Sequence, residues 1–175
     1  MRKGGIGGGN TKTGLTYEGK VDLEVFLNKQ TGYTVKDGEV YFKGERIASI
    51  FKKNGFYTFL KKEGVDWKKI VSKRILPDQC IMVVVKNTVY IIEIKYQQVA
   101  GSVDEKLQTC DFKLKQFRKL LASLNLKVEY IYLLNDWFLQ ESYKDVLDYI
   151  IDVGCSYYFN YIPLDVLGLP LPSQK

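Results

Sequence analysis

Three charged side chains in the middle of the chain could do chemistry together: Asp78, Glu93 and Lys95. Two carboxylates a few ångströms apart repel each other, and a divalent metal ion between them removes that repulsion. A lysine beside such a pair can orient or deprotonate a water molecule. The three residue types therefore indicate metal-assisted hydrolysis, if the fold brings them to one place.

Two apolar, β-branched runs within residues 77–98 must position these side chains. The runs predict a β-hairpin, and because they are apolar at nearly every position, both strands should be buried in the middle of a sheet. Strand period puts Glu93 and Lys95 on one face. A two-residue turn, in either register that the sequence allows, places Asp78 on that face, opposite Lys95 or Gln97. The alternative is a buried hairpin that has a charged end and no function.

The string Pro77-Asp78, fourteen further residues and Glu93-Ile94-Lys95 resembles the PD-(D/E)XK nuclease signature. The resemblance implies an α/β fold with a restriction-endonuclease-like core, in which helices flank a mixed central sheet. It also implies that Asp78 and Glu93 hold a metal ion and that Lys95 positions or activates the attacking water. Gln97 would contact the residues that bind the metal ion, without binding the ion itself.

The first residues of the chain carry a second resemblance. Residues 8–18, Gly-Gly-Asn-Thr-Lys-Thr-Gly-Leu-Thr-Tyr-Glu, are similar to the opening of a group of small type II restriction endonucleases, with Gly9 in place of the usual alanine. So many glycines within residues 1–14 disfavour a regular element. We expect a loop that brings Asn10 and Lys12 close to a nucleic-acid backbone or groove, and the alternative is a terminal tail.

A helix is expected over residues 16–28, because Glu18, Val21 and Val25 lie on one helical stripe. Packing of that stripe would turn the Glu18 carboxylate toward the sheet, and the family resemblance adds Glu18 to the metal site. The alternative is a carboxylate that is favoured near the helix start by the helix dipole alone.

The net charge of +6 is concentrated in one part of the chain. Residues 52–74 hold eight basic and two acidic residues, and aromatic residues are interleaved among them. This pattern favours a polyanionic partner, and the best candidates for phosphate contacts are Lys61, Lys62, Lys68 and Lys69. The alternative is a solvated face without a partner.

The composition excludes several classes of site. The chain has no histidine, which rules out histidine bases and histidine metal ligands. A metal ion would need oxygen ligands, which points to Mg²⁺, with Mn²⁺ as a substitute. The three cysteines lie in apolar settings and are expected to be reduced core residues. With no apolar run of ~18 residues and no signal peptide, the protein is expected in the cytoplasm, away from membranes.

Local patterns predict the remaining elements of a single domain spanning residues 1–175. We expect a small hairpin, two short amphipathic helices, a long helix with a capping box, a strand parallel to the hairpin, an outer helix, a final strand and an irregular tail. Their expected ranges are residues 38–52, 56–62, 67–73, 102–124, 127–134, 141–153, 156–162 and 163–175.

Together, these features predict a magnesium-dependent endonuclease that cuts double-stranded DNA, most simply a type II restriction enzyme. A homodimer is expected, because cutting two antiparallel strands needs two sites and a chain of this length supplies one. A Holliday-junction resolvase or repair nuclease shares the same core and stays open as an alternative. A DNA-binding protein without catalysis is the alternative of another class.

Overall fold

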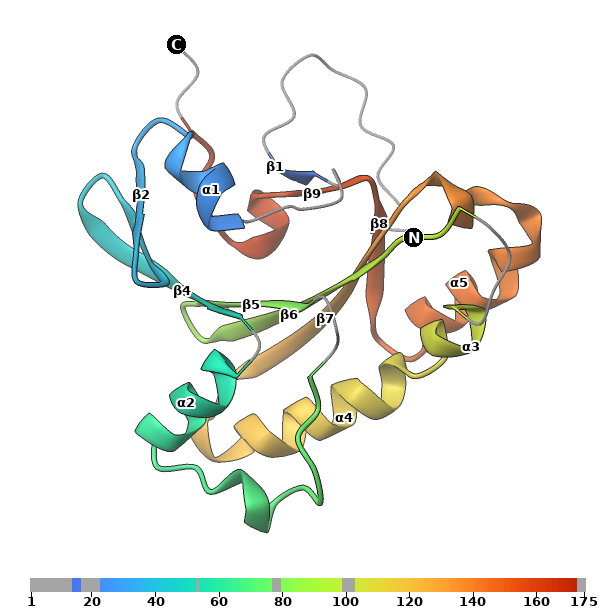
Figure 1. The fold of residues 1–175 in the computed structure, drawn as a ribbon, viewed down its shortest axis with the longest axis horizontal. Coiled ribbons are helices and arrows are strands. Elements are labelled where there is room, and N and C mark those ends of the chain that lie inside the picture. Colours follow the sequence, from blue (N-terminus) through green and yellow to red (C-terminus); the bar gives the residue numbers. More distant parts are fainter. Residues whose placement is uncertain (1–13, 17–22, 53, 77–79, 99–102, 173–175) are drawn as a thin grey trace.

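The computed structural model describes residues 14–16, 23–52, 54–76, 80–98 and 103–172. Within them, a mixed sheet of seven strands runs in the order β2-β3-β4-β5-β6-β7-β8 (Figure 1). Neighbours are antiparallel from β2 to β6, and β6, β7 and β8 are parallel. The strands are β2 (Tyr33–Lys36), β3 (Glu39–Phe42), β4 (Glu45–Lys52), β5 (Cys80–Val85), β6 (Thr88–Lys95), β7 (Lys127–Leu134) and β8 (Ser156–Phe159). The predicted mixed α/β sheet is confirmed.

Helices cover both faces of this sheet (Figure 1). One face carries α2 (Gly55–Lys62), α3 (Val103–Leu107), α4 (Cys110–Leu121) and α5 (Lys144–Asp152). The other carries α1 (Leu23–Asn28) and the turn η5 (Asp165–Leu167), near a small antiparallel pair of β1 (Gly14–Thr16) and β9 (Tyr161–Pro163). Further 3₁₀ turns are η1 (Trp67–Lys69), η2 (Ala122–Leu124), η3 (Asp136–Leu139) and η4 (Glu141–Tyr143).

The hairpin of β5 and β6 lies in the middle of the sheet, as predicted. Its turn is the pair Lys86-Asn87, because Val85 pairs with Thr88. Apolar side chains of β6 alternate between the two layers of core: Val89 and Ile91 face α4, and Ile92 faces α1. Glu93 has the same parity as Ile91, which places it on the α4 side of the sheet.

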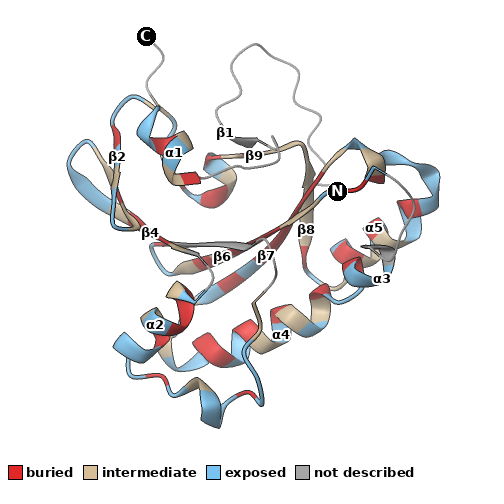
Figure 2. Cartoon of the chain, viewed as in Figure 1, coloured by how far each residue is buried: buried red, intermediate tan, exposed pale blue. Residues whose placement is uncertain are grey.

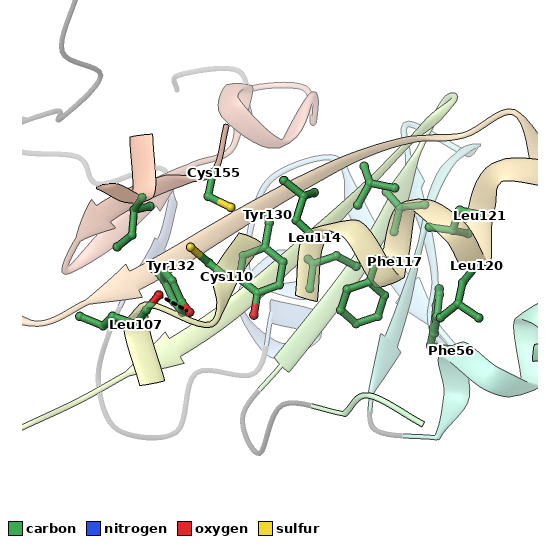
Figure 3. Close-up of a cluster of buried hydrophobic side chains, with 14 of the residues drawn as sticks. Phe56, Leu107, Cys110, Leu114, Phe117, Leu120, Leu121, Tyr130, Tyr132 and Cys155 are labelled. Atoms are coloured by element: carbon green, nitrogen blue, oxygen red, sulfur yellow. Dashed lines mark hydrogen bonds between the residues drawn. The ribbon is translucent and has the colours of Figure 1, made fainter. Parts of the chain in front are cut away.

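The stripe predicted for residues 102–124 packs against the sheet, but it belongs to two helices. Leu107 ends α3, and the stripe continues in α4 with Cys110, Leu114 and Phe117, all fully buried (Figures 2 and 3). Between the helices, the Thr109 hydroxyl donates to the Lys106 carbonyl at 2.7 Å. Burial of each large apolar side chain stabilises the fold by about 1.5–3 kcal/mol, which ties α4 firmly to β6 and β7.

The structure describes the side chains of two of the three cysteines, which were predicted to be reduced core residues. Cys110 and Cys155 are buried, reduced and close together in the core beside α4 (Figure 3). This prediction is confirmed for both. The side chain of Cys80 lies outside the described part of the chain.

The prediction for the first helix is partly wrong. Thr16 belongs to β1, and among the described residues α1 spans Leu23–Asn28. Leu23 and Leu27 are the buried residues of α1, while Val25 is 51% exposed. The helix therefore buries its leucines, which offer more apolar area, and the expected stripe through Val25 does not face the sheet.

Other differences concern shorter segments. The helix expected over residues 67–73 is reduced to the single turn η1. Strand β2 was not anticipated, and it extends the small hairpin of β3 and β4 to three strands. The expected last strand is divided between β8 and β9, which belong to different sheets. Within the predicted tail, Leu164, Leu167 and Leu169 are buried in the core on the α1 side.

Candidate active site

Glu93 is the centre of the candidate site. It lies on β6, pairs in register with Cys80 of β5 and Tyr132 of β7, and is 1% exposed. A carboxylate so deeply buried is costly unless charged or hydrogen-bonding partners surround it. The side chains around Glu93 therefore determine whether its carboxyl group is ionised and what it can bind.

Three side chains from three elements converge on this carboxylate. Lys95, two residues along β6, places Nζ 2.5 Å from Oε1. Lys113 of α4 donates to both oxygens, at 3.0 Å to Oε1 and 2.9 Å to Oε2. The hydroxyl of Tyr130 on β7 donates to Oε2. Both ammonium groups are largely shielded, since the side chains of Lys95 and Lys113 are 15% and 18% exposed.

These partners keep Glu93 ionised. Burial alone raises the pKa of its carboxyl group, but the positive charges of Lys113 and Lys95 and the hydrogen bonds from Lys95 and Tyr130 outweigh burial. The net pKa lies below the usual range for glutamate. Glu93 is therefore a buried carboxylate anion at neutral pH, the form that binds a cation.

The structure brings together Glu93 and Lys95, as the strand period predicted. Four other predicted residues, Asp78, Glu18, Asn10 and Lys12, lie outside the described residues. Their proposed roles stay predictions. Leu23 and Leu27 of α1 pack on the sheet face opposite Glu93. The helical stripe through Val25 therefore gives no reason to place Glu18 beside Glu93, and only the family resemblance supports that role.

Gln97 follows the end of β6 and is 6% exposed. Asn135 holds its backbone from both sides: the Gln97 amide donates to Oδ1 at 3.1 Å, and Nδ2 donates to the Gln97 carbonyl at 2.9 Å. This clamp fixes the chain where it leaves β6. A role for Gln97 in supporting the metal ligands stays a prediction.

Sequence reasoning missed two members of the site. Lys113 is one of several lysines on the helix predicted over residues 102–124, and the structure directs it to the buried Glu93 carboxylate. It follows Cys110 by three residues and precedes Phe117 by four, so it borders the buried stripe, a signal that was readable in the sequence. Tyr130 could have been found by strand alternation, since it shares a face with Tyr132.

The four lysines predicted to contact phosphates, Lys61, Lys62, Lys68 and Lys69, are all exposed, on α2 and η1. A hollow of about 680 Å³ lies between these two elements. Lys61, Lys68 and Arg74 are among its lining residues. The guanidinium of Arg74 lies over the rings of Tyr57 and Trp67, at 5.1 and 5.0 Å from the ring centroids. The hollow therefore combines cations with aromatic surface.

The comparison with protein families decides what kind of domain this is. A family model described as PD-(D/E)XK nuclease superfamily domain matches residues 17–116, more than half of the chain. The chain belongs to the PD-(D/E)XK nuclease superfamily. The predicted family is thus confirmed, and the match supports nuclease activity. Neither the comparison with curated proteins nor that with solved structures gave a match.

PD-(D/E)XK nucleases generally use divalent metal ions, and the residues present fit that use. The ionised oxygens of Glu93 are hard ligands, and the chain has no histidine to favour a softer metal. Across the described ranges, no three acidic, cysteine or histidine side chains come together. The other predicted ligands, Asp78 and Glu18, fall outside those ranges.

No helix within the described ranges is long and apolar enough to cross a membrane.

Proposed function

We propose that this PD-(D/E)XK protein is a magnesium-dependent endonuclease that hydrolyses phosphodiester bonds in double-stranded DNA, acting as a homodimer of the type II restriction kind. The observation that carries the proposal is the buried, ionised Glu93 in contact with Lys95, inside a nuclease-family domain. A charged cluster in the core is costly to keep, and catalysis gives a reason for it.

In this proposal, Glu93, Asp78 and Glu18 hold Mg²⁺, and Mn²⁺ can substitute. The observed turn, Lys86-Asn87, is the one for which the sequence predicts Asp78 opposite Lys95. The metal ion would offset charge on the scissile phosphate and lower the pKa of its bound water. Lys95 would orient the attacking water, or accept its proton after its own ammonium group has lost a proton to solvent. Tyr130 keeps the Glu93 carboxylate directed toward the α4 side of the sheet.

The exposed lysines of α2 and η1 support a DNA substrate. Lys61, Lys62, Lys68 and Lys69 can neutralise backbone phosphates without reading bases. Asn10 and Lys12 would approach a groove, and Gln97 would stabilise the metal ligands. Dimerisation follows from the need for one site per strand.

The deciding experiment incubates the protein with plasmid, linear duplex and four-way-junction DNA, each with and without Mg²⁺. We expect discrete bands from the duplex substrates only when Mg²⁺ is present. Cleavage confined to the junction would instead establish a resolvase. Binding to DNA without any cleavage would establish a non-catalytic DNA-binding protein and refute the proposed activity.

We also expect Glu18→Gln to raise the Mg²⁺ or Mn²⁺ concentration needed for half-maximal cleavage, because the substitution would remove one metal ligand while keeping the side-chain shape. If the carboxylate only favours a helix start, its loss costs about 0.3–1 kcal/mol of stability and leaves the metal requirement unchanged. Metal titrations of the cleavage rate, together with thermal melts, separate these effects. An unchanged metal midpoint and maximal rate would remove Glu18 from the site.

A further inference from the structure

The carboxylate of Glu93 is saturated with contacts from the protein itself. Oε1 contacts the ammonium groups of Lys95 and Lys113, and Oε2 accepts from Lys113 and Tyr130. An ionised carboxylate offers about four lone-pair positions, and these contacts use all of them. A metal ion that binds Glu93 must therefore displace one of the three side chains.

Lys113 is the partner best able to leave. Tyr130 is fully buried on the neighbouring strand, where its ring packs against Phe117 and Tyr132 (Figure 3). Lys95 is attached to the same strand as Glu93, only two residues away. Lys113 instead reaches the carboxylate from α4 through a flexible four-carbon stem, and its side chain keeps a partly exposed path to solvent.

Charge also makes Lys113 a competitor of the metal ion. Two ammonium groups share one described carboxylate, so this cluster is positive by one charge before a cation arrives. Removal of one ammonium would lower the repulsion felt by a divalent cation. The second lysine would therefore weaken metal binding at Glu93, whereas a residue that serves only the metal site would strengthen it.

We propose that Lys113 is a positioning residue that holds the Glu93 carboxylate until a divalent cation displaces it, and then turns its ammonium group to a phosphate oxygen of the DNA. This inference rests on the proposed nuclease function. Exchange of the partners of Lys113 couples metal binding to DNA binding, because each ligand frees or uses the same ammonium group. No covalent bond changes in this step.

The rival explanation is a static ion pair that only supports the fold. A static pair predicts that loss of Lys113 destabilises the protein and leaves metal affinity unchanged, or weakens it because Glu93 loses its orientation. The displacement proposal predicts the opposite sign. Metal affinity should rise when the competing ammonium is removed.

The test is calorimetric titration of the full chain with Mn²⁺ in the absence of DNA. We expect Lys113→Gln to bind Mn²⁺ about tenfold more tightly than the unaltered protein, because one ammonium group fewer repels the cation. Lys113→Arg keeps a cation and should show no such gain. Lys115→Gln is the matched control, because Lys115 lies on the same helix but is exposed and paired with Asp111.

Equal or weaker Mn²⁺ binding by Lys113→Gln overturns the proposal. If this variant does not fold, Lys113→Met keeps most of the aliphatic stem without the charge, and the same expectation applies to it. An unaltered protein that binds no Mn²⁺ refutes the proposed metal-dependent nuclease as well. Normal Mn²⁺ binding that does not respond to either variant refutes only the role of Lys113.

The proposed transfer of the Lys113 ammonium group to a DNA phosphate is tested separately, by measuring DNA binding with and without Mn²⁺. On duplex DNA whose backbone linkages are non-hydrolysable, Lys113→Gln should weaken binding at saturating Mn²⁺, and leave it unchanged when Mn²⁺ is chelated. The metal must first release the ammonium from Glu93. A loss of affinity that is the same with and without Mn²⁺, or no loss at all, would overturn the transfer of Lys113 to the phosphate.

Discussion

Cleavage of duplex DNA should fall by more than ~100-fold in Lys95→Ala and in Glu93→Ala, the scale of a general acid-base contribution. In our proposal, Lys95 acts on the attacking water and Glu93 holds the metal, so loss of either side chain slows the hydrolysis step itself. DNA affinity should stay largely intact, since neither side chain lies on the exposed surface of α2 and η1. Single-turnover cleavage rates and binding isotherms of each variant measure the two effects separately.

Controls must separate lost chemistry from lost folding. Glu93→Ala leaves the ammonium groups of Lys95 and Lys113 without their shared counterion, so Glu93→Gln should be measured beside it, with thermal melts of both. Lys86→Ala is the surface control, because this lysine is exposed in the turn of the same hairpin. If a folded Lys95 or Glu93 variant cleaved DNA at nearly the rate of the unaltered protein, the proposed catalytic role of that residue would be refuted.

Replacement of Lys61, Lys62, Lys68 and Lys69 by glutamine should weaken binding to all DNA sequences alike. Each phosphate contact contributes about 0.9 to the slope of log affinity against log salt, so four contacts would lower the slope by up to about 3.6. At 0.1 M salt, this corresponds to a loss of affinity on the order of 1,000-fold. Binding isotherms over a range of salt concentrations measure both quantities.

The matched control changes the same number of charges elsewhere. The exposed lysines outside α2 and η1 include Lys36, Lys43, Lys127 and Lys144. Their replacement by glutamine lowers the net charge equally and should change the slope much less. Equal slopes in the two quadruple variants would show that general charge, and no particular surface, attracts the DNA. An unchanged slope in the α2 and η1 variant would place those lysines away from it.

Much of the central architecture was predictable because local patterns carry it. The unbroken apolar runs predict two buried strands joined by a two-residue turn, and the structure selects Lys86-Asn87 and its register from the two that the sequence left open. Strand β7 lies within the predicted residues 127–134, parallel to β6. Strand period alone was enough to place Glu93 and Lys95 on one face, where they form an ion pair.

The sequence pattern alone could not predict which of two apolar faces of a helix is buried. In α1, a stripe through Val25 and a stripe through Leu23 and Leu27 are both helical, and only the core selects the leucines. The tail after residue 163 has no period, yet Leu164 and Leu167 are buried because the α1 side of the sheet has apolar surface to cover.

The candidate site shows the same division. The sequence by itself determined that a carboxylate and a lysine share one strand face in the middle of a sheet. Only the tertiary structure decided that Lys113 and Tyr130 complete the contacts of Glu93, because those contacts join residues 20 and 37 positions apart. Periodicity places a side chain on a face of its own element, whereas the packing of α4 and β7 against β6 determines which charges meet.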